Sequence, residues 1–220
     1  MIRRTLAALL AAWMLPQAGA HAQGGAIHGV ITAPDAGISG IVVYLIPAAA
    51  APAAAPPVTA DVDQRDLRFV PRVVAVTPGS TVYFSNSDPV LHNVFHPLQH
   101  GGFDLGTYPQ GERRSFTFGE EGVYVIFCHV HPEMVGYVVV LASPYRAVTD
   151  EGGRFRIAGL PPGTYHLRTW HRRLRTHDQV VTIPSNGAVR VDLSLPYGSP
   201  AEPRAADRVV SGARRNAARP

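Results

Sequence analysis

The segment CHVHPEM, Cys128 to Met134, holds the only cysteine of the 220-residue chain together with two histidines and a methionine. It lies between two apolar runs, VYVIF before it and GYVVVL after it, whose β-branched and aromatic residues are typical of strands. The segment is therefore predicted to be a short loop that joins two strands. Such a loop would hold a thiol, an imidazole and a thioether on rigid supports.

These side chains favour a copper site. One thiolate, two imidazoles and a weak axial thioether form the ligand set of blue-copper electron-transfer centres. The second imidazole is available in SNSDPVLHNVF, where His92 follows the predicted strand TVYFSN and has hydrophobic neighbours. We predict one mononuclear type 1 copper, held by His92 together with the thiol, an imidazole and the thioether of CHVHPEM. The alternatives are a copper-free sandwich with a buried, inert thiol and a zinc site, although zinc rarely recruits a thioether.

Three further histidines lie close to the predicted ligands in the sequence. His129 points away from Cys128 by strand alternation, so we expect it at the surface. His96 and His100 lie in HPLQHGG, and we expect them to be ordinary exposed loop residues.

The same residues resemble the cupredoxins, the small blue-copper proteins of the plastocyanin and amicyanin type, over residues 61–142. The motifs are the pair His92-Asn93 followed by VF, and a late Cys-x-x-His-Pro-x-Met that runs from Cys128 to Met134 with the amicyanin spacing. The resemblance implies a Greek-key sandwich in which His92, Cys128, His131 and Met134 bind one type 1 copper. It also implies that Asn93 forms a hydrogen bond across the site and steadies the loop.

The flanking segments resemble another fold. TDEGGRFRIAGLPPGTYHLRTW and the opening GAIHGVITAPDAGISGIVVYLIP are similar to the carboxypeptidase-regulatory, or prealbumin-like, β-sandwich. We expect residues 23–47 and 144–196 to form this sandwich, with residues 48–60 as a Pro/Ala linker and residues 61–142 inserted as the cupredoxin domain. The alternative is one continuous cupredoxin with extra edge strands. Chains of this combined architecture resemble proteins labelled methylamine utilisation protein.

The predicted fold class is all-β, since no helical period stands out after the first residues. Residues 1–22 have the pattern of a secretory signal: Arg3 and Arg4, an apolar run from Leu6 to Leu15, and small residues that end at Ala22. The apolar run is too short to cross a membrane, which needs about 20 residues. We therefore expect export to the periplasm and no stable membrane insertion. Residues 197–220 have almost no large apolar side chains and are predicted to be a disordered tail.

The charge of the chain gives no reason to expect nucleic acid as a partner. The formal net charge is +4 and every basic side chain is arginine, but Arg3, Arg4 and the tail after Tyr197 supply the excess, and residues 23–196 carry 13 arginines against 14 acidic residues, a net charge of −1. One basic cluster lies outside the tail, in WHRRLRTH from Trp170 to His177. We expect a solvated loop there, with a docking patch as the alternative.

The function that these patterns favour is one-electron transfer in the periplasm between redox partners such as a dehydrogenase, a cytochrome or an oxidase. We do not expect an enzyme, because no catalytic motif is present and four protein ligands leave copper no open position for a substrate. The alternative is a periplasmic copper carrier or storage protein without an electron-transfer role.

Overall fold

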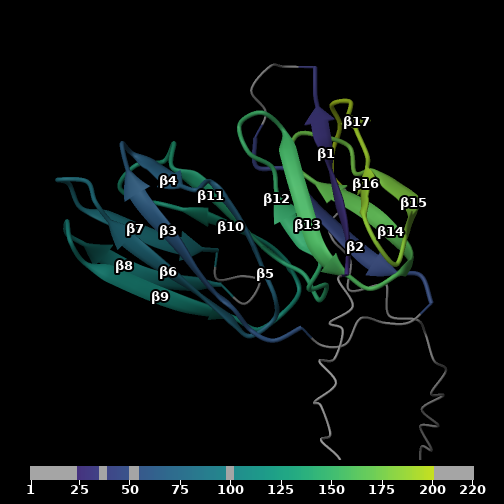
Figure 1. Ribbon diagram of the computed structural model, residues 1–220. Coiled ribbons are helices and arrows are strands. Elements are labelled where there is room, and N and C mark those ends of the chain that lie inside the picture. The colour runs from purple at the N-terminus through teal and green to yellow at the C-terminus, as the bar shows by residue number, and fades with distance from the viewer. Residues whose placement is uncertain (1–23, 35–38, 50–54, 98–101, 201–220) are drawn as a thin grey trace, which may run out of the picture.

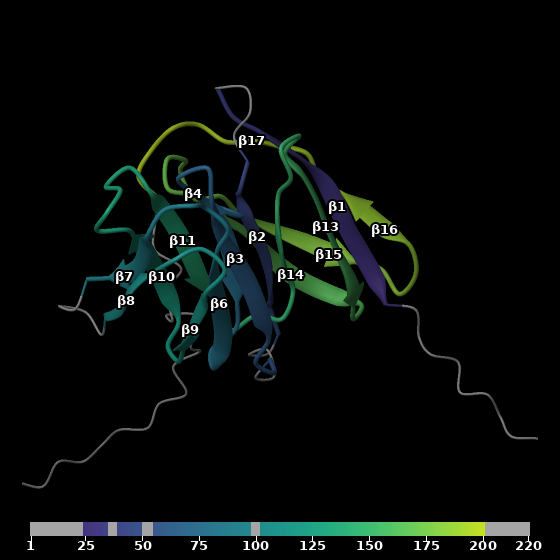
Figure 2. The same ribbon diagram turned by 90° about the vertical axis from the view of Figure 1, so that its left-hand side faces the viewer.

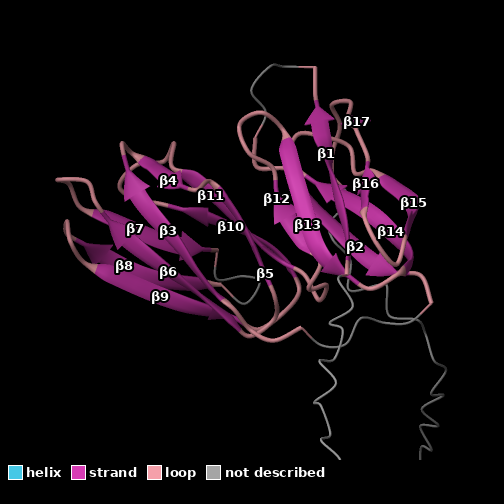
Figure 3. Ribbon diagram, viewed as in Figure 1, coloured by secondary structure: helices cyan, strands magenta, loops and turns pink. Residues whose placement is uncertain are grey.

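The computed structural model describes residues 24–34, 39–49, 55–97 and 102–200. This part of the chain consists of strands joined by turns and loops (Figure 3). None of its segments forms a helix of the length and apolarity that crossing a membrane requires. The predicted secretory signal lies outside the described residues.

The middle of the chain forms two facing sheets, which we call the inner sandwich. One sheet has the order β5-β11-β10-β7-β8 and the other has the order β4-β3-β6-β9. The strands of the first sheet are β5 (Val73–Val76), β7 (His92–His96), β8 (Phe103–Tyr108), β10 (Gly122–Phe127) and β11 (Val135–Val140). Those of the second are β3 (Thr59–Arg65), β4 (Arg68–Val70), β6 (Ser80–Asn86) and β9 (Arg113–Phe118).

The inner sandwich is held together by alternating apolar residues. Strand β6 has a strict two-residue period of burial, with Val82 and Phe84 fully inside. These side chains meet Val138 and Val140 of the opposite sheet in one core cluster. Cys128 belongs to the same cluster, so the apolar core extends to the loop that carries the predicted ligands.

The two ends of the described chain form the second pair of sheets, the outer sandwich. Its sheets have the orders β13-β1-β16, with β17 also paired to β1, and β12-β2-β14-β15. The strands of the first sheet are β1 (Gly25–Thr32), β13 (Arg154–Leu160), β16 (Ala188–Arg190) and β17 (Leu193–Ser194). Those of the second are β2 (Val42–Pro47), β12 (Arg146–Val148), β14 (Gly163–Trp170) and β15 (Asp178–Ile183).

The inner sandwich occupies the chain between β2 and β12. These two strands are neighbours in one sheet of the outer sandwich, where Val43 pairs with Ala147. The two sandwiches consist of separate sheets, which lie on either side of the molecule in Figure 1. The boundaries that we gave for the domains and the linker stay predictions.

The two sandwiches lie against each other through a shared apolar cluster. Strand β11 is buried over nearly its whole length, because one face packs into the inner core and the other faces the outer sandwich. Tyr137 on that second face meets Trp170 of β14, with 5.5 Å between the ring centroids. Arg146 of β12 also donates from Nε to the carbonyl of Ala75 in β5, over 3.0 Å. In Figure 2 the inner sandwich lies in front of the outer one.

Two expectations need correction. The basic segment that begins at Trp170 is not simply a solvated loop, because Trp170, His171 and Leu174 are all buried and only the arginines among them are exposed. The predicted disordered tail also begins too early. Tyr197 forms a β-bridge with Leu174, whereas residues 201–220 lie outside the described part of the chain.

Candidate metal centre

The first part of the site is the loop that connects β6 to β7. Asn86 ends β6, and its side-chain amide donates to the carbonyl of Val90 over 2.8 Å and to that of Tyr108 over 3.1 Å. Its Oδ1 accepts the backbone N–H of Asp88. These bonds fix the connecting loop, so that His92 enters β7 as a fully buried first residue.

The other ligands come from the loop between β10 and β11. Cys128 follows β10 directly and is 2% exposed, while Met134 precedes β11 and is 1% exposed. Within the loop, the N–H of Met134 donates to the carbonyl of His131 over 3.0 Å, which closes a tight turn. The flanking strands pair with each other along their whole length, from Gly122–Val140 to Phe127–Val135. The sheet therefore sets the separation between the two ends of the loop.

Three donor atoms converge at this point. Cys128 Sγ lies 3.9 Å from His92 Nδ1 and 4.0 Å from His131 Nδ1, and the two Nδ1 atoms are 3.1 Å apart. A metal that binds nitrogen at about 2.0 Å and thiolate sulfur at about 2.3 Å would separate its ligands by similar distances. This is also the group of described histidine, cysteine and acidic residues whose donor atoms come close enough to hold a metal ion.

Met134 completes the donor set. Its side chain is buried in the same core cluster as Cys128, at the end of the loop that both residues delimit. A thioether is a soft, weak ligand, which suits copper and is rare in zinc sites. The combination of one thiolate, two imidazoles and one thioether therefore fits copper by donor chemistry as well as by geometry.

A buried carboxylate orients His92. Asp88 Oδ2 lies 2.9 Å from His92 Nε2, and the two side chains are 9% and 0% exposed. Because a carboxylate can only accept, Nε2 carries the proton and the lone pair of Nδ1 is directed at Cys128. Burial alone would raise the pKa of Asp88, but the N–H of Leu67, the ring of His92 and the N–H of Asp66 hold that pKa below its ordinary value.

Asn93 ties the two halves of the site together. Its Oδ1 accepts the N–H of His129 over 2.8 Å, and its own N–H points at Cys128 Sγ over 3.5 Å. The first of these bonds is the bridge across the site that the cupredoxin resemblance implied. Asn93 Nδ2 also donates to Asp104 of β8 over 2.7 Å, which holds the amide in place.

The remaining histidines have other roles. His129 is exposed, as predicted, and its ring stacks on Phe95 with centroids 3.7 Å apart. The expectation for His96 was wrong, because it is the last residue of β7, is half-buried and bonds the carbonyl of Val125 from Nδ1. His96 pairs with Phe103 of β8, so it belongs to the strand and not to the loop that the sequence indicated. His100 lies outside the described residues.

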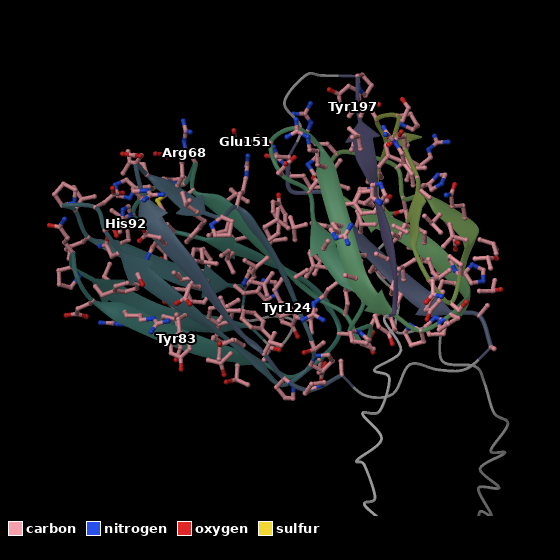
Figure 4. All side chains as sticks on the ribbon, in the orientation of Figure 1. Arg68, Tyr83, His92, Tyr124, Glu151 and Tyr197 are labelled. Carbon is pink, nitrogen blue, oxygen red and sulfur yellow. The ribbon has the colours of Figure 1, made fainter. Side chains whose placement is uncertain are left out.

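Asp88 is the functional residue that sequence reasoning missed. It stands four positions before His92, in the turn SNSDPVLH, but nothing in the sequence shows which side chains of a turn face inward. Exposed apolar side chains lie near the site. His92 lies toward one end of the inner sandwich and Tyr124 toward the other (Figure 4). At the His92 end, Val90, Leu91 and Val130 are 42%, 53% and 45% exposed.

Two family models match parts of the chain. Residues 56–141 match the family model of copper binding proteins of the plastocyanin/azurin family, and residues 133–196 match that of the carboxypeptidase regulatory-like domain. Similar solved structures include amicyanin from Paracoccus versutus, with 28% identity over 47% of this chain and 100% of that one at a TM-score of 0.36. A purple cupredoxin from Nitrosopumilus maritimus has 29% identity over 37% of this chain and 99% of that one, at a TM-score of 0.35. No curated protein matched the chain.

The inner sandwich is a cupredoxin domain, and its cluster of His92, Cys128, His131 and Met134 is a type 1 copper site. The assignment rests on the family match and on the converging donor atoms. The chain as a whole combines this cupredoxin domain with a carboxypeptidase regulatory-like domain.

Proposed function

We propose that this protein carries single electrons between redox partners in the periplasm. The observation that carries the proposal is the closed donor set of His92, Cys128 and His131, whose atoms converge within 4.8 Å beside a buried methionine. Copper bound there would gain and lose one electron, and the protein would supply a fixed ligand geometry for both states. A site with no open position suits electron transfer better than substrate chemistry, so we do not expect an enzyme.

His131 offers a route for the electron, because exposed apolar residues surround it at the surface. His131 is half-buried in its loop, and its neighbours Val130 and Pro132 are exposed. Leu91, the chain neighbour of His92, is also an exposed apolar residue. Transient electron-transfer contacts are small, below about 1,200 Å², and a compact apolar rim around one ligand is sufficient for them. The partner would be a dehydrogenase, a cytochrome or an oxidase.

Export supports the same proposal but depends on the sequence alone. The signal pattern in residues 1–22 favours the periplasm, where such carriers meet their partners. The label of methylamine utilisation protein stays a prediction that no comparison tests.

One titration tests the function. Adding Cu(II) to the metal-free protein should give an intense blue or green colour at one equivalent, because charge moves from the thiolate of Cys128 to the metal when light is absorbed. Voltammetry of the coloured form should then show a reversible one-electron wave. A colourless Cu(II) complex would contradict the type 1 site. A coloured complex that binds Cu(I) tightly but shows no reversible wave would favour the copper carrier.

A further inference from the structure

A cleft of about 840 Å³ lies between the two sandwiches and reaches the metal centre at Met134. The inner sandwich lines it with residues 67–73 and 133–135, and the outer sandwich lines it with residues 148–151 and 170–173. Arg68 and Glu151, on facing sides, are visible in Figure 4. Clefts of about 300–1,000 Å³ at domain interfaces are common places for small ligands.

Arginine side chains gather in this cleft. Arg68, Arg72, Arg172 and Arg173 all line it. Among the described residues, no acidic group lies within ion-pair distance of Arg68, Arg72 or Arg172. Arg72 uses only its Nε, which donates to the carbonyl of Val135 over 3.1 Å. The rest of its guanidinium group remains available to an anion.

The arginines repel one another. Burial lowers the pKa of Arg72 most, and the charge of Arg172 lowers it next; Tyr137 opposes them, and Arg173 and Arg68 lower it further. Burial also lowers the pKa of His171 to about 4, with further lowering by Arg172 and Arg173. This mutual repulsion costs free energy that a bound anion would relieve.

The described acidic residues of the cleft form no ion pair with Arg68, Arg72 or Arg172. Glu133, Asp150 and Glu151 also line the cleft. Asp150 is occupied by Arg154, 3.6 Å away, and by the backbone N–H groups of its own turn. Glu133 and Glu151 are exposed and form no ion pair with a cleft arginine.

Each sandwich contributes one aromatic side chain to the lining of the cleft. Trp170 and Tyr137, which pack against each other, are 4% and 8% exposed and both line the cleft. Their rings offer an apolar surface for the carbon skeleton of a ligand, and guanidinium groups bind carboxylate or phosphate oxygens in pairs.

We propose that this cleft binds a small organic anion that carries at least two carboxylate or phosphate groups. Such a ligand would contact both sandwiches at once. The proposal goes beyond electron transfer and does not depend on it, because the arginines and aromatic rings that it uses are not copper ligands. Met134 lies at the edge of the cleft, but the proposal does not use it.

Tryptophan fluorescence provides the test. The chain has two tryptophans, Trp13 and Trp170, so Trp13→Phe in the full chain leaves Trp170 as the sole reporter in the cleft. Citrate and pyrophosphate are titrated separately at constant ionic strength, with sodium chloride as the reference. At least one probe should give a saturable change with half-saturation below about 1 mM. Citrate alone would indicate a polycarboxylate ligand, and pyrophosphate alone would indicate a phosphate ligand.

Matched variants separate a site from general charge screening. Arg172→Gln and Arg68→Gln should each raise the half-saturation concentration about tenfold, because each removes a charge-assisted hydrogen bond. Arg156→Gln removes the same charge from an exposed position of β13 outside the cleft and should leave it unchanged. All three should bind copper as the parent does, which shows that they fold. The proposal would be overturned if Arg172→Gln and Arg156→Gln weakened binding of the probe equally. It would also be overturned if citrate and pyrophosphate gave no fluorescence change beyond that caused by sodium chloride.

Discussion

His92 donates a hydrogen bond from Nε2 to Oδ2 of Asp88 over 2.9 Å, and both side chains are buried. The bond fixes the ring so that Nδ1 is directed at Cys128, 3.9 Å away. It also places a negative charge one residue removed from the metal. That charge would stabilise Cu(II) more than Cu(I), because the oxidised ion carries the greater positive charge.

Replacing Asp88 with Asn should therefore raise the reduction potential of the copper. We expect a rise of about 60 mV, which corresponds to a tenfold change in the relative stability of the two oxidation states. Voltammetry of the copper-loaded protein measures it. Asp61→Asn is the matched control, since Asp61 is an exposed carboxylate whose side chain is 68% accessible on β3. A shift of the same size in both variants would mean that Asp88 acts only through net charge.

The ligands should not contribute equally to the optical spectrum. Cys128→Ala removes the thiolate, so it should abolish the charge-transfer band. Met134→Leu removes only a weak axial ligand from a buried position and should leave a coloured site with a changed potential. Visible absorption after one equivalent of Cu(II) compares the two. If Met134→Leu lost the colour as completely as Cys128→Ala, the axial role of Met134 would be wrong.

His171 should make the metal-free protein sensitive to acid. Its pKa falls from 6.5 to about 4 because of burial and then the neighbouring arginines, so the folded protein keeps it neutral while the unfolded chain protonates it. The unfolded state then binds more protons between these two values, and stability is lost as the pH falls through this window. The loss reaches at most about 3 kcal/mol.

The variant His171→Asn tests this expectation. Its side-chain oxygen can accept the N–H of Arg173, which Nδ1 of His171 accepts over 3.3 Å. Urea unfolding of metal-free protein, followed by circular dichroism at pH 6.5 and pH 4, gives the free energy of unfolding of each form. The variant should lose less stability than the parent across this range. Equal losses would show that His171 is not the group responsible.

Trp170 should link the stability of the two sandwiches. It is 4% exposed and packs on Tyr137 of the inner sandwich, so Trp170→Ala should lower the free energy of unfolding by about 3–5 kcal/mol. Trp170→Phe keeps an aromatic ring there and should cost much less. In scanning calorimetry, the alanine variant should separate the unfolding of the two sandwiches into distinct transitions. A single transition in that variant would mean that the contact does not couple them.

The copper ligands were predictable because their residue types and order are so unusual. A lone cysteine, a nearby histidine and a methionine between two apolar strands leave few structural explanations, and His92 follows from the need for a second imidazole. Asp88 was not predictable, since a turn sequence does not reveal which side chain faces the interior. The orientation depends on the N–H groups of Asp66 and Leu67, which come from a different loop.

The contact between the sandwiches left a signal that the sequence reading did not use. A strand with one solvated face alternates apolar and polar residues, as β6 does. Strand β11 has Val138, Val139 and Val140 in a row, and all three are fully buried. Such a continuous apolar run indicates burial on both faces, one toward the inner core and one toward a neighbour. The run predicts a covered face but does not say what covers it.

The strand order of the described residues also implies an order of folding. Val30 donates to Asp192 across 162 positions of the chain, so the outer sandwich cannot be completed until nearly all of the described residues have been synthesised. The inner sandwich needs only the residues between β3 and β11 and can form earlier. Once formed, it brings the end of β2 close to the start of β12. It thereby removes most of the entropy cost of loop closure that would otherwise oppose formation of the outer sandwich. The metal-binding half would thus serve as the folding template for the other.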